Sequence, residues 1–449
     1  MKSRRCKVLH PVAGRPMISY VTDAAFSAGF SEVCLVVGHQ ADEVRRGLPG
    51  EGIRFVVQEP QLGTGHAVSA AQGMLEGFSG HVLILCGDIP LIRPETIKDF
   101  IGFHESARSR LTVMTTHPDD PSGYGRIIRK DGGTIARIVE QRDADEEEKA
   151  VREINTGIYL VECRLLYQLL AKVTPDNSQR EYYLTDIVKE ADRESVPVHG
   201  YVLQNPEEAA GINTRVELAQ ASARIWDQIR KRLMMGGVTL IDPASVYVDS
   251  QVSIGEDTIL YPGVMIEGQT TIGSDCVIEP GVIIRDSILG DRVAVLQGSR
   301  LDRAVVQDGA MIGPMANLRP ETKIGKSARI GNFVEVKKST VGDGTKAAHL
   351  TYLGDSSIGS EVNIGCGTIT CNYDGRKKHP TIIRDRCFVG SDVQFIAPVE
   401  IGEGSVIGAG STITRDVPPD SLAVSRAKQK NYPLRSSQRP KKSDETRKH

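Results

Sequence analysis

Asp88 and His349 are two side chains whose type and position could support chemistry. Asp88 follows the apolar run from His81 to Cys86, and the ligands of α/β proteins gather where buried strands end. His349 lies within Lys346–Gly354, and an imidazole, which ordinarily titrates near pH ~6.5, suits a base at neutral pH. Alone, Asp88 could also be a turn or helix cap before Pro90, and a lone histidine is more often structural. The helices and strands around these two residues must therefore decide between a structural and a functional role.

The eight cysteines indicate no zinc or dithiol site. They are widely scattered, and none has the C-x-x-C spacing of such sites. No secretory signal precedes the first expected element, so we expect reduced, mostly buried thiols, no disulfides and a cytoplasmic protein. The positions are Cys6, Cys34, Cys86, Cys163, Cys276, Cys366, Cys371 and Cys387.

Length and composition narrow the class of protein. A chain of 449 residues predicts about three domains, or two larger ones. The 55 basic and 57 acidic residues give a net charge of −2, which argues against binding nucleic acid through bulk positive charge. No stretch approaches the ~18 uninterrupted apolar residues of a membrane span. We therefore expect a soluble protein with no nucleic-acid or membrane partner.

The first part of the chain has the pattern of an α/β domain. Short β-rich runs alternate with segments of 3- and 4-residue apolar spacing, which predict crossover helices over a mainly parallel sheet. The expected strands are Val33–Val37, Arg54–Gln58, His81–Cys86 and Leu111–Thr116, and examples of the expected helices are Met17–Ala28 and Gly65–Leu75. We place this domain at residues 1–211.

A long helix and then a new period follow. Residues 212–235 are expected to form a connecting helix whose apolar face is Val216, Ala219, Ala223, Trp226, Ile229 and Leu233. Afterwards an apolar residue, usually aliphatic, recurs every six positions and is often followed by glycine. Such positions are Ile254, Leu260, Ile266, Ile272, Ile278 and Ile284, and later Val389, Phe395, Ile401, Ile407 and Ile413.

The hexapeptide period predicts a parallel β-helix over residues 236–425. Each hexapeptide would form one flat side of a triangular coil, with its aliphatic residue inside and a glycine allowing the corner, where φ can be positive. The remaining residues, 426–449, carry nine Lys/Arg against two acids. Their composition predicts a solvated basic tail, whose first residues could reach an anionic ligand.

An α/β front domain joined by a helix to a left-handed hexapeptide β-helix resembles one bacterial enzyme family. That family is the bifunctional N-acetylglucosamine-1-phosphate uridyltransferase and glucosamine-1-phosphate acetyltransferase. The resemblance covers nearly the whole chain, and nine segments in order carry it: 7–10, 61–66, 87–91, 123–126, 154–157, 181–186, 331–335, 349–355 and 370–375. It implies that acetyl-CoA acetylates glucosamine 1-phosphate and that UTP then gives UDP-N-acetylglucosamine, which feeds cell-envelope sugars.

The chain departs from the family pattern at its beginning. The family starts with an apolar strand and a glycine-rich Leu-Ala-Ala-Gly-x-Gly-Thr-Arg-Met loop, and Met1 stands where that methionine would be. Such a loop gives backbone N–H groups and an arginine to the nucleotide phosphates. We therefore expect unpaired strand edges in the front domain and weak uridyl transfer by the chain as printed. Either the start is misplaced or truncated, or the first activity is lost.

For the uridyltransferase site, the resemblance implies a set of phosphate, metal, base and sugar contacts. Asp88 and Asn213 would bind Mg²⁺, and oxygen ligands suit that ion. Lys7 would contact the phosphates, because uridyl transfer brings together several negatively charged phosphate groups whose charge must be neutralised. Besides Lys7 and Asn213, the UTP- and UDP-N-acetylglucosamine-binding set has two groups. The uracil base would be read by Gln58, Gln61, Gly63 and Thr64, and the sugar would be bound by Gly125, Glu140, Asn155, Tyr183 and Thr185.

For the acetyltransferase site, the resemblance makes His349 the base that deprotonates the amino group of the sugar. The glucosamine-phosphate-binding residues would be Arg319, Lys337, Tyr352 and Asn363, and the acetyl-CoA-binding residues Cys366, Asn372, Tyr373, Lys378, Ser391, Ala409 and Arg426. Family members usually have alanine where this chain has Cys366, and an interaction through the backbone amide would tolerate the change.

Coils of this type pack around a threefold axis, so we expect a homotrimer. Two other interpretations stay open from the sequence: an acetyltransferase with an inactive front domain, and a regulatory subunit without catalysis.

Overall fold

The computed structural model describes residues 1–48 and 50–433, so most of the predicted tail lies outside the described residues. The chain folds as two compact units. The first contains Met1–Lys231 with Val248–Ser250, and the second begins at Arg232 and contains the hexapeptide repeats. The domain limits 211, 235 and 425 stay predictions.

The first unit contains most of the helices. Its helices are α1 (Met17–Ser27), α2 (Ala41–Gly47), α3 (Thr64–Ala70), α4 (Pro94–Ser106), α5 (Glu146–Ala150), α6 (Cys163–Leu170), α7 (Asp186–Arg193) and most of α8 (Arg215–Met235), with 3-10 turns η1 (Lys7–Leu9), η2 (Gln72–Leu75) and η3 (Pro206–Ala209). Its strands are β1 (Pro11–Val12), β2 (Arg15–Pro16), β3 (Val33–Val37), β4 (Ile53–Val57), β5 (His81–Ile84), β6 (Leu111–Thr116), β7 (Arg126–Arg129), β8 (Ile135–Val139), β9 (Ile154–Glu162) and β10 (Val198–Leu203).

The prediction of a mainly parallel sheet was wrong for this unit. β3 pairs parallel with β4, and β10 with β6. However, β9 runs antiparallel to both β5 and β6, and β7 and β8 form an antiparallel hairpin. β9 follows that hairpin and the five-residue α5 rather than a long crossover helix, so it returns against its neighbours. The four strands expected from the sequence are all present.

Helices cover both faces of the larger sheet. Along β9, Tyr159 and Val161 pack in one cluster with residues of α6 and α7, whereas Ile158 and Leu160 pack in another with α1 and α4. This alternation follows from the two-residue period of a strand. Within the described residues, β3 and β5 each pair with a strand on one side only.

A buried histidine in this unit should make its stability depend on pH. His104 of α4 is 2% exposed, and its Nδ1 lies 2.7 Å from Thr112 Oγ1. Burial, followed by the charges of His81 and His199, lowers the pKa of His104 to about 4. The unfolded chain would take up this proton below its ordinary pKa of about 6.5. Stability is therefore present above pH ~6.5 and lost between about 6.5 and 4, by about 3 kcal/mol.

Urea unfolding followed by the fluorescence of the single tryptophan, Trp226, checks this expectation. His104→Asn should flatten the pH dependence over that interval, because the titrating group is gone. His39→Asn, which changes an exposed histidine in the same unit, should leave the wild-type dependence intact. Equal slopes for wild type and His104→Asn would contradict the assignment.

Helix α8 forms where the sequence predicts it, but with a different buried face. Glu217 Oε2 accepts bonds from the backbone N–H groups of Asn213 and Thr214, and Thr214 Oγ1 accepts from Glu217 N, so the first turn is capped. Val216, expected on the apolar face, is 67% exposed. The buried stripe is Leu218, Ala221, Ser222, Ile225, Ile229 and Leu233. The prediction was therefore wrong before Ile229, because it placed the buried positions about two residues too early, at Val216, Ala219 and Ala223 instead of Leu218, Ala221 and Ile225.

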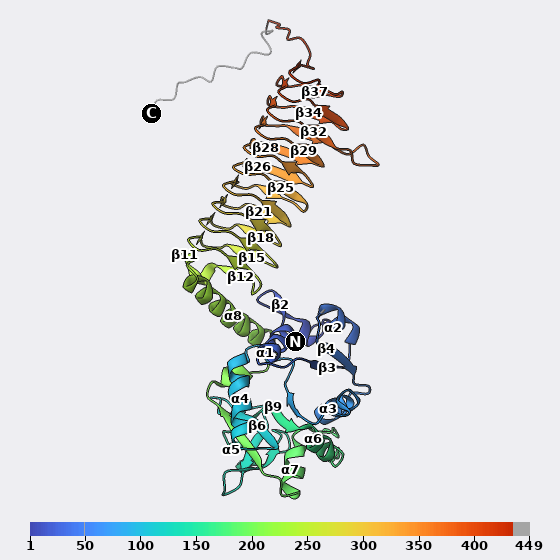
Figure 1. Ribbon diagram of the computed structural model, residues 1–449, viewed down its shortest axis with the longest axis vertical. Coiled ribbons are helices and arrows are strands. Elements are labelled where there is room, and N and C mark those ends of the chain that lie inside the picture. The colour runs from blue at the N-terminus through green and yellow to red at the C-terminus, as the bar shows by residue number, and fades with distance from the viewer. Residues whose placement is uncertain (49, 434–449) are drawn as a thin grey trace, which may run out of the picture. The chain divides into compact units, whose positions relative to one another are not determined.

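The second unit is a parallel β-helix of hexapeptide repeats, as predicted, and Figure 1 shows its short strands stacked in successive coils. After η4 (Pro243–Ser245), one side consists of β13 (Ser253–Ile254), β16 (Thr271–Ile272), β19 (Ile288–Leu289), β22 (Ala304–Val306), β25 (Thr322–Ile324), β27 (Thr340–Val341), β29 (Ser356–Ile358), β32 (Thr381–Ile383) and β35 (Val399–Ile401).

The other two sides form one continuous ladder. One carries β11 (Thr239–Leu240), β14 (Ile259–Leu260), β17 (Val277–Ile278), β20 (Ala294–Val295), β23 (Met311–Ile312), β30 (Asn363–Ile364), β33 (Phe388–Val389), β36 (Val406–Ile407) and β38 (Leu422–Ala423). The other carries β12 (Tyr247–Val248), β15 (Met265–Glu267), β18 (Ile283–Arg285), β21 (Arg300–Asp302), β24 (Asn317–Leu318), β31 (Ile369–Cys371), β34 (Gln394–Ile396) and β37 (Thr412–Ile413). The nine-residue strands β26 (Arg329–Lys337) and β28 (Lys346–Gly354) pair with strands of both sides, so they turn the corner without a break.

The aliphatic positions point inward, but the glycines have a different role from the expected one. Leu260, Ile266, Ile278 and Ile284 are fully buried. Most of the glycines that follow the aliphatic residues, Gly342 and Gly365 among them, are not in the positive-φ region, and Gly313, with φ of +103°, is an exception. A Cβ at Gly342 would lie 2.5 Å from the carbonyl carbon of Gly359, and one at Gly365 would lie 2.4 Å from that of Gly390. Glycine is required there because successive corners stack too closely for a side chain.

None of the helices in the described part of the chain is long and apolar enough to cross a membrane.

Candidate active sites

Lys7, Asp88 and Asn213, which the sequence assigns to phosphate and metal, lie together in the first unit. The ammonium of Lys7 donates to Asp88 Oδ2 at 2.5 Å and to Asn213 Oδ1 at 2.6 Å. Asp88 follows β5, and its carbonyl accepts from Ile212 N at 3.0 Å, which holds the segment before α8 beside it. A carboxylate and an amide oxygen are a donor set that fits Mg²⁺, with substrate and water oxygens completing the shell.

The loop from Gln58 to Thr64 is tied to the segment before α7. Gln58 Nε2 donates to the carbonyl of Gly63 at 3.0 Å, and Thr64 Oγ1 accepts from Leu184 N at 3.0 Å. Gly63 has φ of +110°, and a Cβ there would lie 2.7 Å from the carbonyl oxygen of Tyr182. The side chain of Gln61 covers Gly38, because a Cβ at Gly38 would lie 1.8 Å from Gln61 Nε2. The predicted base-binding loop is therefore a fixed turn.

The residues assigned to the sugar also converge. Thr185 Oγ1 donates to Glu140 Oε1 at 3.3 Å, and Asn155 N donates to the carbonyl of Gly125 at 2.9 Å. A Cβ at Gly125 would lie 3.5 Å from both carboxylate oxygens of Glu140, so Gly125 leaves this carboxyl uncovered. Burial raises the pKa of Glu140, and burial followed by the neighbouring acids raises the pKa of Tyr183. These polar groups suit the hydroxyl and amide groups of a sugar.

In the second unit, His349 lies at the head of a column of predicted acetyl-CoA contacts. β28 pairs with β26 so that His349 lies beside Asn332. In successive coils, Ala347 pairs with Ile364, Ile364 with Val389, and Val389 with Ile407. The residue two positions after each of these therefore lies at the same corner of its coil, so that the four residues form a column. The exposed residues of this column are His349, Cys366, Ser391 and Ala409. Arg426 continues it, because its Nη1 donates to the carbonyl of Ala409 at 2.6 Å.

The imidazole of His349 is oriented by a neighbour that the sequence did not single out. Its Nδ1 lies 2.9 Å from Asn332 Oδ1. Since an amide oxygen only accepts hydrogen bonds, the neutral ring carries its proton on Nδ1 and leaves the Nε2 lone pair available. Asn332 precedes His349 by 17 residues, which is one coil, so this interval was the signal for finding it.

Arg319 and Lys337, assigned to the sugar phosphate, lie on neighbouring coils. Leu318 pairs with Val336, so the following residues, Arg319 and Lys337, stack at one edge. Arg319 Nη1 donates to Glu335 Oε1 at 2.8 Å, and this bond raises the pKa of Arg319. Tyr352 pairs with Glu335 in the next coil. Asn363 lies on a different side of the coil, next to Lys346 in the ladder, so the structure does not bring it beside Arg319.

Asn372, Tyr373 and Lys378 belong to an excursion that interrupts the repeat, as expected. Ser357 pairs with Thr340 in the preceding coil, which lies 17 residues earlier in the sequence. In the following coil it pairs with Ile382, which lies 25 residues later, so the chain makes an extra loop between them. Tyr373 and Lys378 form a bridge at the base of the extra loop. The proximity of Lys337 lowers the pKa of Lys378.

Asp355 is a second residue that the sequence analysis missed. It accepts from Asn372 Nδ2 at 2.5 Å and lies 3.8 Å from Lys337 Nζ. Its carboxylate therefore links a predicted phosphate contact to the base of the excursion. Asp355 ends the segment 349–355, but no role was predicted for it, because the contact depends on the 17-residue coil length and on where the excursion leaves the coil.

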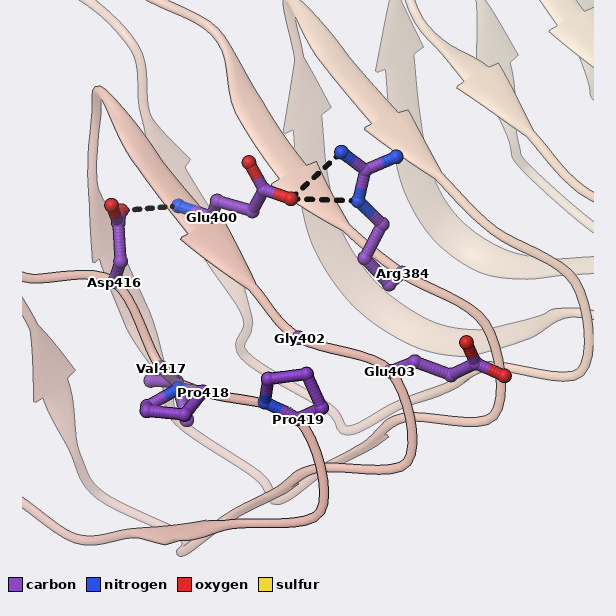
Figure 2. Close-up of a pocket in the computed structure, with 8 residues that line it drawn as sticks. All are labelled: Arg384, Glu400, Gly402, Glu403, Asp416, Val417, Pro418 and Pro419. Atoms are coloured by element: carbon purple, nitrogen blue, oxygen red, sulfur yellow. Dashed lines mark hydrogen bonds and ion pairs between the residues drawn. The ribbon is translucent and has the colours of Figure 1, made fainter.

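A cavity of about 450 Å³ near the end of the coil, shown in Figure 2, contains none of the predicted site residues. Arg384 bonds Glu400 Oε1 at 2.7 Å, and Asp416 accepts from Glu400 N at 2.8 Å. Arg386 pairs with Glu403. These charges satisfy one another, so we assign them to the packing of the last coils.

Comparisons with known proteins agree with this two-part architecture. Residues 2–205 match the family model described as nucleotidyl transferase, and residues 251–286 and 380–415 match the bacterial transferase hexapeptide model of six repeats.

Relatives named bifunctional protein GlmU match almost the whole chain. The relative from Geotalea uraniireducens (strain Rf4) is 52% identical over 432 residues, and that from Geobacter metallireducens (strain ATCC 53774 / DSM 7210 / GS-15) is 50% identical over 449. Each match covers 96% of this chain and 94% of the relative. One from Exiguobacterium sp. (strain ATCC BAA-1283 / AT1b) is 46% identical, with 96% and 95% covered. With both of its domains matched and nearly its full length shared, the chain belongs to the bifunctional GlmU family.

Proposed function

We propose that this protein acetylates glucosamine 1-phosphate with acetyl-CoA and then transfers uridylate from UTP to the N-acetylglucosamine 1-phosphate so formed. The observation that carries the proposal is the near-full-length match to bifunctional relatives, in which a nucleotidyl transferase domain precedes the hexapeptide coil. The presence of that front domain favours two activities over an acetyltransferase alone. The column headed by His349 favours catalysis over a regulatory role.

Acetyl transfer needs a base at the amino group of the sugar. Nε2 of His349 takes a proton from the ammonium, and the amine lone pair then attacks the thioester carbonyl. The carbon–sulfur bond breaks, and the imidazolium returns its proton to the leaving thiolate, which gives coenzyme A. The nitrogen of the new amide releases its remaining extra proton to water. Asn332 holds Nδ1–H and so keeps Nε2 directed to the substrate. Cys366, Ser391 and Ala409 provide a track of small residues along which the thioester arm can lie.

The phosphate of the sugar is the natural partner of the positive charges near this column. Lys337 and Lys378 repel one another, as the lowered pKa of Lys378 reflects, and Asp355 supplies only one opposing charge. A phosphate between them relieves that repulsion. Arg319, with its planar fork of donors, adds a bidentate contact. This charge arrangement selects a phosphorylated sugar over a neutral one.

Uridyl transfer places a phosphate oxygen of the sugar against the α-phosphate of UTP, with pyrophosphate leaving. Lys7 neutralises phosphate charge, the Gln58–Thr64 turn holds the uracil edge, and Glu140, Asn155 and Thr185 hold the sugar. Asp88 and Asn213 would hold Mg²⁺, which, when bound, supplies further positive charge at the phosphates.

Separate assays of the two half-reactions on the full chain test the proposal. Free coenzyme A release with glucosamine 1-phosphate should report the first, and pyrophosphate release with UTP and N-acetylglucosamine 1-phosphate should report the second. Acetyl transfer without pyrophosphate release would favour the acetyltransferase interpretation. Neither product would favour the regulatory one.

The same proposal includes a homotrimer held by the coil. Three outward apolar residues, Phe388, Val406 and Leu422, stack in register on one side and are 51, 40 and 71% exposed. Exposed apolar strips of this kind favour association. Sedimentation should give three times the 48.8 kDa of one chain. Val406→Glu should weaken the assembly more than Thr412→Glu on another side, and a monomer at micromolar concentration would contradict the trimer.

We place the protein in the cytoplasm, because that compartment supplies both UTP and acetyl-CoA.

A further inference from the structure

Lys7 occupies the two oxygens that the proposed function assigns to a divalent cation. Its Nζ bonds Asp88 Oδ2 at 2.5 Å and Asn213 Oδ1 at 2.6 Å. The side chains of Lys7 and Asp88 are 35 and 24% exposed, so the pair is partly shielded from water. An ammonium and a metal ion compete for the same oxygen lone pairs. Each of them therefore weakens the binding of the other.

Of the three partners, Lys7 has the longest and most flexible side chain. The backbone of Asp88 accepts from Ile212 N at 3.0 Å, and Asn213 N donates to Glu217 Oε2 at 2.5 Å. The backbones that carry the two oxygen donors are thereby held to one another and to the start of α8. Lys7 reaches them on a long methylene stem from the short turn η1, and lysine ammonium groups are mobile point charges.

We propose that Lys7 is an exchangeable internal counter-ion, which holds Asp88 and Asn213 until nucleotide phosphates draw its ammonium away. The inference rests on the proposed function and concerns the order of events at that site. Without nucleotide, the ammonium keeps the divalent cation weakly bound. With nucleotide present, the phosphates take the ammonium and the two oxygens become available. Lys7 therefore couples cation binding to nucleotide binding.

The expected change in cation affinity follows from the strength of the Lys7–Asp88 ion pair. A partly exposed ion pair with one further hydrogen bond changes an equilibrium by on the order of tenfold. Removing the ammonium should thus tighten cation binding in the absence of nucleotide. The same change should harm uridyl transfer, so affinity and activity move in opposite directions. A purely structural lysine would not tighten cation binding when removed.

Direct titration with Mn²⁺ alone, followed by electron paramagnetic resonance on the full chain without nucleotide, tests the inference. Lys7→Met should bind Mn²⁺ about tenfold more tightly than wild type. Lys7→Arg, which keeps a cation at the position, should bind like wild type. Arg5→Ala, which removes an exposed charge two residues away, should also bind like wild type and exclude a general charge effect.

Three outcomes separate failure of the inference from failure of the proposed function. Equal Mn²⁺ affinity of wild type and Lys7→Met would overturn the counter-ion role, as would equal tightening by Arg5→Ala. In the Lys7→Met background, Asp88→Asn should abolish the gain. A gain that survives Asp88→Asn would show that the cation binds elsewhere, which contradicts the proposed metal ligands themselves. Thermal unfolding of each variant shows that the compared proteins are folded.

Discussion

Replacing His349 by alanine is expected to lower acetyl transfer by about 10²- to 10⁴-fold, the usual contribution of a general base. The ring heads the corner column of the coil, and its Nδ1 contact with Asn332 leaves Nε2 to accept the proton. Uridyl transfer should stay near wild type, because its predicted residues lie in the other compact unit. Coenzyme A release and pyrophosphate release, measured on the same preparation, give the two rates.

Two further variants distinguish loss of the base from loss of packing. His349→Gln retains a polar side chain of similar length but cannot act as the base, so it should lose as much activity as His349→Ala. Asn332→Ala removes only the orienting contact and should cost less, on the order of tenfold, with an altered pH profile. Retention of more than half of the acetyltransferase rate by His349→Ala would remove His349 from the role.

The architecture of the coil could be predicted from the sequence because its signal is local and repeated. A six-residue aliphatic period has few structural explanations, and Leu260, Ile266 and Ile278 are buried as it requires. The reason for the glycines was not local. At Gly365, the obstacle to a side chain is the backbone of Gly390 in the next coil, so the close approach appears only once the coils are stacked.

In the front domain, four of the strands could be predicted, but the strand directions could not. β3 and β6 occupy the expected residues, yet the strand that determines the topology, β9, was not predicted. Strand direction depends on where a connection returns to the sheet, and β9 arrives after a hairpin instead of a crossover helix.

In the candidate sites, residues could be predicted from their types and motifs, but the partners that they contact could not. His349 and Asp88 were found through their types and motifs. Asn332 and Asp355 were missed because their importance lies in register. Asn332 becomes a partner of His349 only because one coil is 17 residues long, and Asp355 meets Asn372 only where the excursion leaves the coil. The contact between Lys7 and Asn213 spans 206 residues and has no local signal at all.

Replacing Asp88 by asparagine is expected to lower uridyl transfer by about 10²-fold or more, the usual cost of removing one group that stabilises transition-state charge. The substitution keeps size and shape but removes the negative charge that Lys7 neutralises and that would hold Mg²⁺ beside Asn213. Acetyl transfer should be unchanged. Pyrophosphate release at saturating Mg²⁺ measures the loss, and Asp99→Asn, at an exposed carboxylate of α4, is the matched control.

The variants Asp88→Asn and His349→Ala should also complement one another when mixed. Each retains the half-reaction that the other lacks, and N-acetylglucosamine 1-phosphate formed by one protein can diffuse to the other. A mixture supplied with glucosamine 1-phosphate, acetyl-CoA and UTP should therefore make UDP-N-acetylglucosamine, whereas neither variant alone should make it at an appreciable rate. If Asp88→Asn retained uridyl transfer within threefold of wild type, Asp88 would not be a metal ligand. Both variants could be impaired as expected while the mixture still made no UDP-N-acetylglucosamine. The intermediate would then have to pass between the two sites of one protein without release, and this result would contradict two sites that act independently.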